Sequence, residues 1–86
     1  MSNELDIQFK SIPLYWEREQ RGLKRNTLRA IDKDDKRFKI LRKCFDNLDK
    51  YDLWIRIINT HTNEVFDRLV TDIYYDTHNQ VLISWN

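Results

Sequence analysis

The sequence is poor in the residues that interrupt or cross-link a chain, with one glycine, one proline and one cysteine among its 86 residues. So few glycines and prolines argue against long irregular loops. The lone Cys44 excludes a disulfide framework and a metal site built from several cysteines. No apolar run approaches the roughly 18 residues that a membrane-spanning helix needs, and no positively charged start precedes an apolar stretch. We therefore expect a soluble, cytoplasmic protein without metal, cofactor or membrane partner.

The overall amino-acid composition is that of a folded domain. Hydrophobic residues make up 41% of the chain and aromatic residues 13%, which favours a packed core over disorder. A chain of this length folds as one domain, residues 1–86, and buries roughly 60–65% of its unfolded surface.

Charge is distributed unevenly along the chain. The net charge is +1, but residues 1–45 hold 12 Lys and Arg against 7 Asp and Glu, whereas residues 46–86 hold 3 against 7. A basic first half suits an anionic partner, and the asymmetry also suits head-to-tail association. The alternative is that these charges simply coat a small surface.

The hydrophobic pattern predicts an α+β fold. Apolar residues recur at helical spacing in two segments, Pro13–Arg21 and about ten residues that follow Asp35, and alternate in the remaining segments. We expect Ser11 to cap the first helix, Leu14 and Tyr15 to point inward, and Trp16 to be either core or a stacking surface. A central strand near 52–58, a strand 64–74 bent around Arg68 and a strand 81–85 would form an antiparallel meander. With two N-terminal strands, at 7–11 and 26–31, it would give a small open β-barrel-like antiparallel sheet with two helices.

The segment Arg21–Arg29 carries the most chemistry. It contains the only glycine, Gly22, which suits the end of a helix because it adopts positive φ without strain. Four cations lie within it and no acid. In the strand that follows, Thr27 and Arg29 would share one face. A hydroxyl and a guanidinium beside these cations can hold an anion or a polar planar group.

These residues carry a family resemblance. The segment Gly22–Arg29 resembles the G-x-K-x-x-E-x-R signature of ASCH domains, in the PUA-like superfamily, with Thr27 in place of the glutamate. With a threonine at that position, the segment is similar to the corresponding motif of the small acetylcytidine amidohydrolases of that family. The resemblance implies a shortened PUA-like barrel that binds RNA or modified bases in a cleft beside the motif.

Three functions follow from these features. The first is non-catalytic binding of a nucleic acid or nucleotide, with Lys24, Arg25 and Arg29 on the phosphate and Thr27 hydrogen-bonding the ligand. Arg21 would add charge and Trp16 a stacking plane, and further aromatic planes would come from Tyr15, Tyr74, Tyr75 and Trp85.

The second function is an amidohydrolase acting on acylated cytidine. The resemblance gives Lys24 and Thr27 as the catalytic candidates, together with a glutamate. A threonine hydroxyl needs a base to act as a nucleophile. Glu64, Asp72 and Asp76 are the acids considered for the third role, and the sequence places none of them at the site.

The third function is a protein-binding inhibitor or adaptor, for instance a virus-encoded one. The acidic residues Asp67, Asp72 and Asp76 would then matter as much as the cations.

Other candidate sites are weaker. His61 and His78 lie in expected turns without cysteine partners, an incomplete zinc ligand set. Cys44 falls on the apolar face of the second helix and is expected to be buried and inert. The outer face of that helix is cationic, and it forms either a solvated surface or a second wall of a phosphate-binding groove: Lys36, Arg37, Lys39, Arg42 and Lys43.

Overall fold

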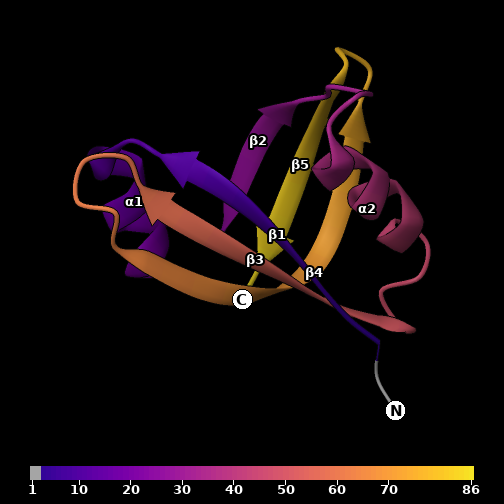
Figure 1. Cartoon of the computed structure of the whole chain (residues 1–86), viewed down its shortest axis with the longest axis horizontal. Helices are drawn as coiled ribbons and strands as arrows, with labels where there is room; N and C mark the ends of the chain where they lie inside the picture. Colours follow the sequence, from indigo (N-terminus) through magenta and orange to yellow (C-terminus); the bar gives the residue numbers. More distant parts are fainter. Residues whose placement is uncertain (1–2) are drawn as a thin grey trace.

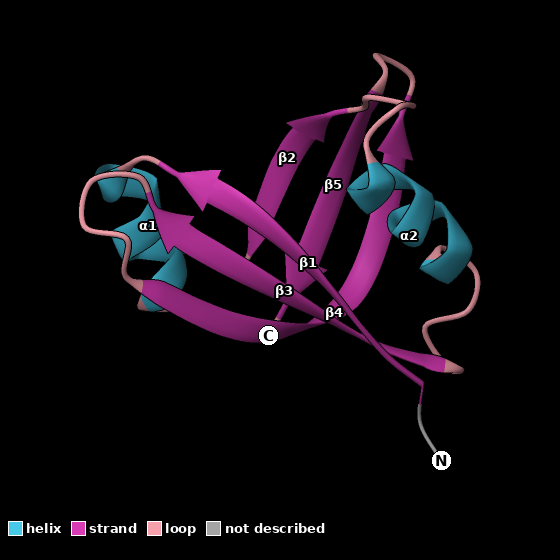
Figure 2. Ribbon diagram, in the orientation of Figure 1, coloured by secondary structure: helices cyan, strands magenta, loops and turns pink. Residues whose placement is uncertain are grey.

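The computed structural model describes residues 3–86, which form five strands and two helices (Figures 1 and 2). The elements in chain order are β1 (Asn3–Ser11), α1 (Pro13–Gln20), β2 (Asn26–Ala30), α2 (Lys36–Cys44), β3 (Tyr51–Asn59), β4 (Val65–Asp76) and β5 (Gln80–Trp85). Neither helix is long and apolar enough to cross a membrane.

The strands form one sheet in the order β1-β3-β4-β5-β2. Strands β3, β4 and β5 are the expected antiparallel meander, and β2 pairs antiparallel with β5. Strand β1 pairs parallel with β3 along its full length. The sheet is open rather than closed into a barrel, so β1 and β2 are its two edges. The predicted α+β class, with a small open, mostly antiparallel sheet and two helices, is confirmed.

The long strand β4 bends the sheet. Its first half pairs with β3 and its second half with β5, and the register shifts between Val70 and Asp72. A bulge of this kind increases local twist, and β4 curves visibly in Figure 1. The predicted bend is confirmed, two residues beyond Arg68. The first half of β4 leads through β3 to β1, and the second half leads through β5 to β2. The bend in β4 therefore turns the two edge strands, β1 and β2, toward each other.

The core lies between the bent sheet and α2. Strand β3 is an interior strand, as expected, paired with β1 and β4, and its Leu53, Ile55 and Ile57 are fully buried. Helix α2 begins at its N-cap Asp35, whose side chain accepts a hydrogen bond from the amide of Arg37. The inward face of the helix inserts three side chains into the core: Phe38, Leu41 and Cys44. The predicted burial of Cys44 is confirmed.

Helix α1 differs from the sequence-based expectation on its first turn. Ser11 ends β1 and does not cap the helix; the N-cap is Ile12, which makes no side-chain cap. Leu14 and Tyr15 are exposed, not inward, with 57% and 47% of their surface accessible. Three consecutive residues of a helix point in different directions, so they cannot all face the protein core. Trp16 takes the inward position, and its indole Nε1 donates to the Ile57 carbonyl at 3.0 Å.

The end of α1 is as predicted. Gly22 has φ +78°, its amide donates to the Glu19 carbonyl at 3.2 Å, and the Leu23 amide donates to the Arg18 carbonyl at 3.0 Å. These two bonds define a Schellman motif, in which a residue with positive φ closes the last turn. The chain therefore reverses here and returns toward the helix before β2 begins.

Candidate ligand-binding site

A pocket of about 330 Å³ lies between the end of β1, helix α1 and strand β2. We call it the α1–β2 pocket. Lys24, Thr27 and Arg29, the three motif residues on which the sequence analysis centres, all line it. The residues that line it are Lys10, Ser11, Ile12, Tyr15, Glu19, Lys24, Thr27, Leu28 and Arg29.

Lys24 reaches the pocket because the glycine turn sends the chain back over the last turn of α1. Its ammonium Nζ donates to the carbonyl of Asn26 at 2.6 Å and to Oε2 of Glu19 at 3.2 Å. An ammonium carries three donors, so one remains for a ligand. The side chain of Lys24 is 32% exposed.

Glu19 is the residue that the sequence analysis missed. It is fully buried, and its Oε1 has no hydrogen-bond partner within residues 3–86. A buried carboxylate oxygen without a donor is costly, and Glu19 is one of the residues that line the pocket. One signal was available in the sequence: Glu19 follows Trp16 by three residues and therefore lies on the inward face of α1.

Thr27 and Arg29 are locked together on β2. Thr27 is 4% exposed, and its Oγ1 accepts a hydrogen bond from Nε of Arg29 at 2.9 Å. Nη2 of Arg29 donates to Oγ of Ser11 at 3.2 Å, and the guanidinium lies 4.8 Å from the Phe9 ring centroid. Arg29 thus links edge strand β2 to edge strand β1.

The guanidinium of Arg29 is partly shielded from water. Burial lowers its pKa from the ordinary arginine value, the carboxylate of Glu19 raises it, and the charge of Arg37 lowers it. Arginine stays protonated in proteins, so the shift does not remove the charge. It shows instead that the charge sits in a poorly hydrated place, where an anionic or polar ligand gains most from meeting it.

The rim of the pocket is apolar and exposed. Ile12, Tyr15 and Leu28 expose 52%, 47% and 51% of their surfaces, and the Tyr15 ring centroid lies 5.8 Å from Nζ of Lys24. A few convergent polar groups below apolar walls are the usual composition of a small-ligand site. The arrangement can hold a flat molecule by its polar edge and cover its faces.

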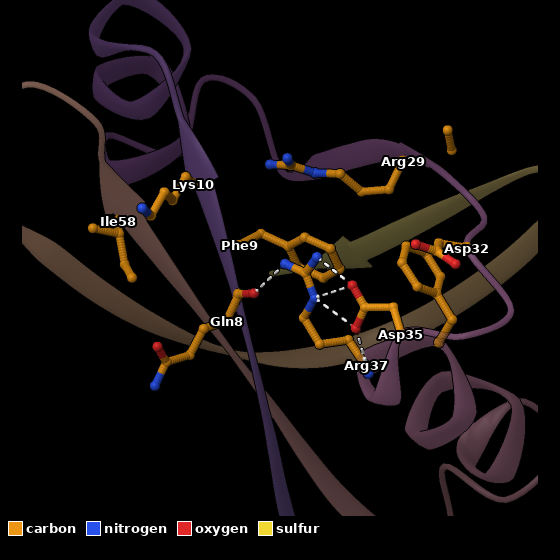
Figure 3. A pocket seen from close by; sticks show the side chains of 10 residues that line it. Gln8, Phe9, Lys10, Arg29, Asp32, Asp35, Arg37 and Ile58 are labelled. Atoms are coloured by element: carbon orange, nitrogen blue, oxygen red, sulfur yellow. Dashed lines mark hydrogen bonds and ion pairs between the residues drawn. The ribbon is translucent and has the colours of Figure 1, made fainter.

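A second pocket, of about 560 Å³, is shown in Figure 3 and shares Lys10 and Arg29 with the first. We call it the Arg37 pocket. Nε of Arg37 donates to both carboxylate oxygens of Asp35 at 3.0–3.1 Å and Nη2 to Oδ2 at 2.6 Å. These hydrogen bonds lower the pKa of Asp35. Nη1 donates to the carbonyl of Gln8 at 2.7 Å, and the guanidinium covers Phe9 at 4.3 Å from the ring centroid.

Three of the other predicted ligand-binding residues line neither pocket. Arg21 pairs with Glu17 at 3.4 Å on the surface. Nε of Arg25 donates to the Gly22 carbonyl at 3.2 Å. Trp16 packs edge-on against Phe66, with ring centroids 5.6 Å apart, and so belongs to the core.

The remaining candidates are dispersed. Among the five cations of α2, only Arg37 lines either pocket, and it lines the Arg37 pocket alone; Glu64, Asp72 and Asp76 line neither. His61 and His78 are exposed in turns, and residues 3–86 contain no group of three metal-ligating side chains. Burial raises the pKa of the Cys44 thiol.

No family model, curated protein or solved structure matches the chain.

Proposed function

We propose that this protein is a non-catalytic module that binds a nucleotide or a single-stranded nucleic acid in the α1–β2 pocket. The observation that carries the proposal is the pairing of a buried, unsatisfied acceptor with two fixed cations below an apolar rim. Oε1 of Glu19 offers the acceptor, and Lys24 and Arg29 offer donors that their internal hydrogen bonds leave unused. The ASCH resemblance, which rests on Gly22, Lys24 and Arg29, points the same way.

A nucleobase matches this chemistry in two respects. Its polar edge carries donors and acceptors side by side, which suits Glu19 beside Arg29. Its faces are flat and apolar, which suits Tyr15 and Leu28 on the rim. Stacking of a base on an aromatic side chain contributes about 1–3 kcal/mol. The phosphate on the sugar of a bound nucleotide would be attracted to Lys10, which lines the same pocket.

Titration of nucleoside monophosphates and short single-stranded RNAs into the protein tests the proposal. We expect Arg29→Ala and Lys24→Ala to weaken binding at least tenfold and to make its salt dependence shallower, because each removes a cation from the site. Tyr15→Ala serves as a second probe, since Tyr15 lies on the rim and its loss leaves the core intact. Lys50→Ala is the matched control, because Lys50 is an exposed lysine that lines neither pocket.

Two outcomes would contradict the proposal. One is the absence of binding to every member of the panel. The other is binding by the Arg29, Lys24 and Tyr15 variants that matches the parent. Capture of a host protein that survives nuclease treatment, together with either outcome, would favour a protein-binding adaptor.

A second candidate, hydrolysis of acylated cytidine, is favoured by one observation. The α1–β2 pocket contains a carboxylate, an ammonium and a hydroxyl together, from Glu19, Lys24 and Thr27. In this candidate function Glu19 would take the acid role for which the sequence offered Glu64, Asp72 and Asp76. Against the candidate, the Thr27 hydroxyl already accepts from Arg29, and Lys24 already donates to Glu19 and Asn26.

The hydrolytic reading has a direct test. Water would split the acyl–nitrogen bond of N4-acetylcytidine into cytidine and acetate, and both products can be measured. Turnover that is lost in Thr27→Val and in Glu19→Gln would establish the enzyme. Absence of turnover, or turnover that survives Thr27→Val, would leave the binding function alone.

A further inference from the structure

The two pockets adjoin each other between the edge strands of the sheet and share two lining residues. Lys10, on edge strand β1, and Arg29, on edge strand β2, line both pockets. The α1–β2 pocket lies on one side of this pair of residues and the Arg37 pocket on the other. A ligand that occupies both pockets would therefore contact Lys10 and Arg29 where the pockets meet.

Two cations, Lys10 and Arg29, line both pockets. Lys10 is exposed and has no salt-bridge partner within residues 3–86. Arg29 adds a second, partly desolvated cation. Each pocket also contains an acid beside a cation: Glu19 beside Lys24 in the first pocket, and Asp35 against Arg37 in the second. In Figure 3 the guanidinium of Arg29 lies near Phe9, the side chain of Lys10 extends from β1 toward Ile58, and Asp32 lies at the opposite end of the pocket.

The Arg37 pocket also offers a flat surface. The guanidinium of Arg37 is held by Asp35 and by the Gln8 carbonyl, and it rests on Phe9, so its plane is fixed. The side chain is 38% exposed. Single-stranded RNA bases stack on arginine planes as they do on aromatic rings, and a guanidinium that is already oriented loses little freedom when a base covers it.

We infer that the two pockets together bind two consecutive nucleotides of a single strand. One base occupies the α1–β2 pocket, the phosphate that links the nucleotides lies at Lys10 and Arg29, and the next base stacks on Arg37. This inference rests on the proposed function and makes it more specific, since it assigns the protein to oligonucleotides rather than free nucleotides. The volumes of about 330 and 560 Å³ fall within the range of small-ligand sites.

Comparison of ligand lengths tests the inference. The affinities of a nucleoside monophosphate, a nucleoside diphosphate and the corresponding dinucleotide are measured at one salt concentration, with ribose and deoxyribose versions of each. We expect the dinucleotide to bind at least tenfold tighter than the monophosphate, and tighter than the diphosphate, which adds charge without a second base. Comparison of the ribose and deoxyribose versions shows whether RNA or DNA is preferred.

Variants locate the second subsite. Arg37→Lys should remove most of the gain from the second nucleotide and leave monophosphate affinity within about twofold, because Arg37 does not line the α1–β2 pocket. Lys10→Ala should weaken the monophosphate and the dinucleotide alike, because Lys10 lines both pockets. Arg37→Lys keeps the positive charge and removes the plane, so it separates stacking from simple attraction. Lys50→Ala should retain the full gain.

The outcomes distinguish this inference from the function on which it rests. Monophosphate binding without a gain for the dinucleotide overturns the inference and leaves the proposed function standing. An equal gain for the diphosphate, or a gain that survives in Arg37→Lys, also overturns it, because the second base then contributes nothing. Failure of every ligand to bind overturns both.

Discussion

The ammonium of Lys24 lies 3.2 Å from Oε2 of Glu19, a carboxylate that is completely buried. The two residues come from different elements: Glu19 from the last turn of α1, and Lys24 from the loop after the glycine turn. Their contact ties that loop to the helix. It also places a charged acceptor and a charged donor side by side at the floor of the α1–β2 pocket.

This pair predicts a strongly non-additive response to mutation. Lys24→Ala leaves the buried carboxylate of Glu19 without its cation, and an unpaired buried charge costs about 1–3 kcal/mol or more. We expect urea unfolding at pH 7 to show a loss of this size. The double variant Lys24→Ala/Glu19→Gln should be more stable than Lys24→Ala alone, because the uncharged amide tolerates burial better. Equal stability of the single and double variants would show that the carboxylate does not depend on Lys24.

The glycine turn predicts a cost that comes from the backbone alone. A Cβ added at Gly22 meets nothing closer than Nε of Arg25, at 3.8 Å, so Gly22→Ala causes no steric clash. It does force a side chain into the left-handed region, which costs about 1–2 kcal/mol. For a domain of this size, we expect a fall in Tm of about 4–8 °C for each kcal/mol.

Gly22→Asn is the control for this prediction. Asparagine adopts positive φ more readily than alanine, and Asn63 and Asn79 already do so in this chain, at φ 62° and 58°. We expect Gly22→Asn to lose less stability than Gly22→Ala. Equal losses in the two variants would mean that the turn is sensitive to something other than backbone conformation.

Local patterns predicted much of this fold because they correspond to local causes. Alternating Leu53, Ile55 and Ile57 indicated a central strand, and all three are buried. Gly22 indicated a helix end, and it closes a Schellman motif. The parallel pairing of β1 with β3 was not predictable in the same way, because it joins segments more than forty residues apart and depends on which sheet edge is free.

The candidate site was predictable only in part, for a related reason. Strand alternation put Thr27 and Arg29 on one face, and both line the α1–β2 pocket. Glu19 was overlooked because glutamate is seldom fully buried unless it is paired, and its partner Lys24 reaches it only through the turn. Leu14 and Tyr15 were assigned to the core because hydrophobicity alone does not show which of three adjacent apolar residues a short helix turns inward.

The pairing of Arg56 with Asp67 predicts a pH dependence. Nε and Nη2 of Arg56 donate to the two carboxylate oxygens at 2.8 and 3.1 Å. These hydrogen bonds lower the pKa of Asp67 in the folded protein below its unfolded value of about 3.9. The stabilisation is therefore complete above the unfolded pKa and is lost as pH falls through the folded pKa.

Asp67→Asn should accordingly lower the urea midpoint slightly at pH 7 and by less as the pH approaches 2. The effect is small because both side chains are 44% exposed. Asp72→Asn is the control: Asp72 is exposed and forms no salt bridge within residues 3–86, so its small effect should not follow the same pH dependence. A cost of Asp67→Asn that stays constant from pH 7 to pH 2 would contradict the assignment.

The buried Cys44 predicts a thiol whose reactivity reports on the packing of α2. Its exposed fraction is 0%, and burial raises its pKa, although the charge of Lys43 partly opposes this. Because the thiolate is the reactive form, a disulfide reagent must wait for the helix to open. We expect reaction at pH 8 to be at least about 100-fold slower in buffer than in denaturing urea, since opening a core element costs several kcal/mol.

An exposed thiol in the loop that follows α2 provides the comparison. The variant Cys44→Ala/Lys50→Cys carries its thiol at an exposed position just before β3, and it should react rapidly with or without urea. If Cys44 in the native protein reacts in buffer as fast as this exposed thiol, the inward face of α2 is not stably packed against the sheet. Asp35 and Arg37, at the start of the same helix, would then not form a fixed wall of the Arg37 pocket. The rate of this one reaction therefore tests the scaffold on which the second nucleotide subsite depends.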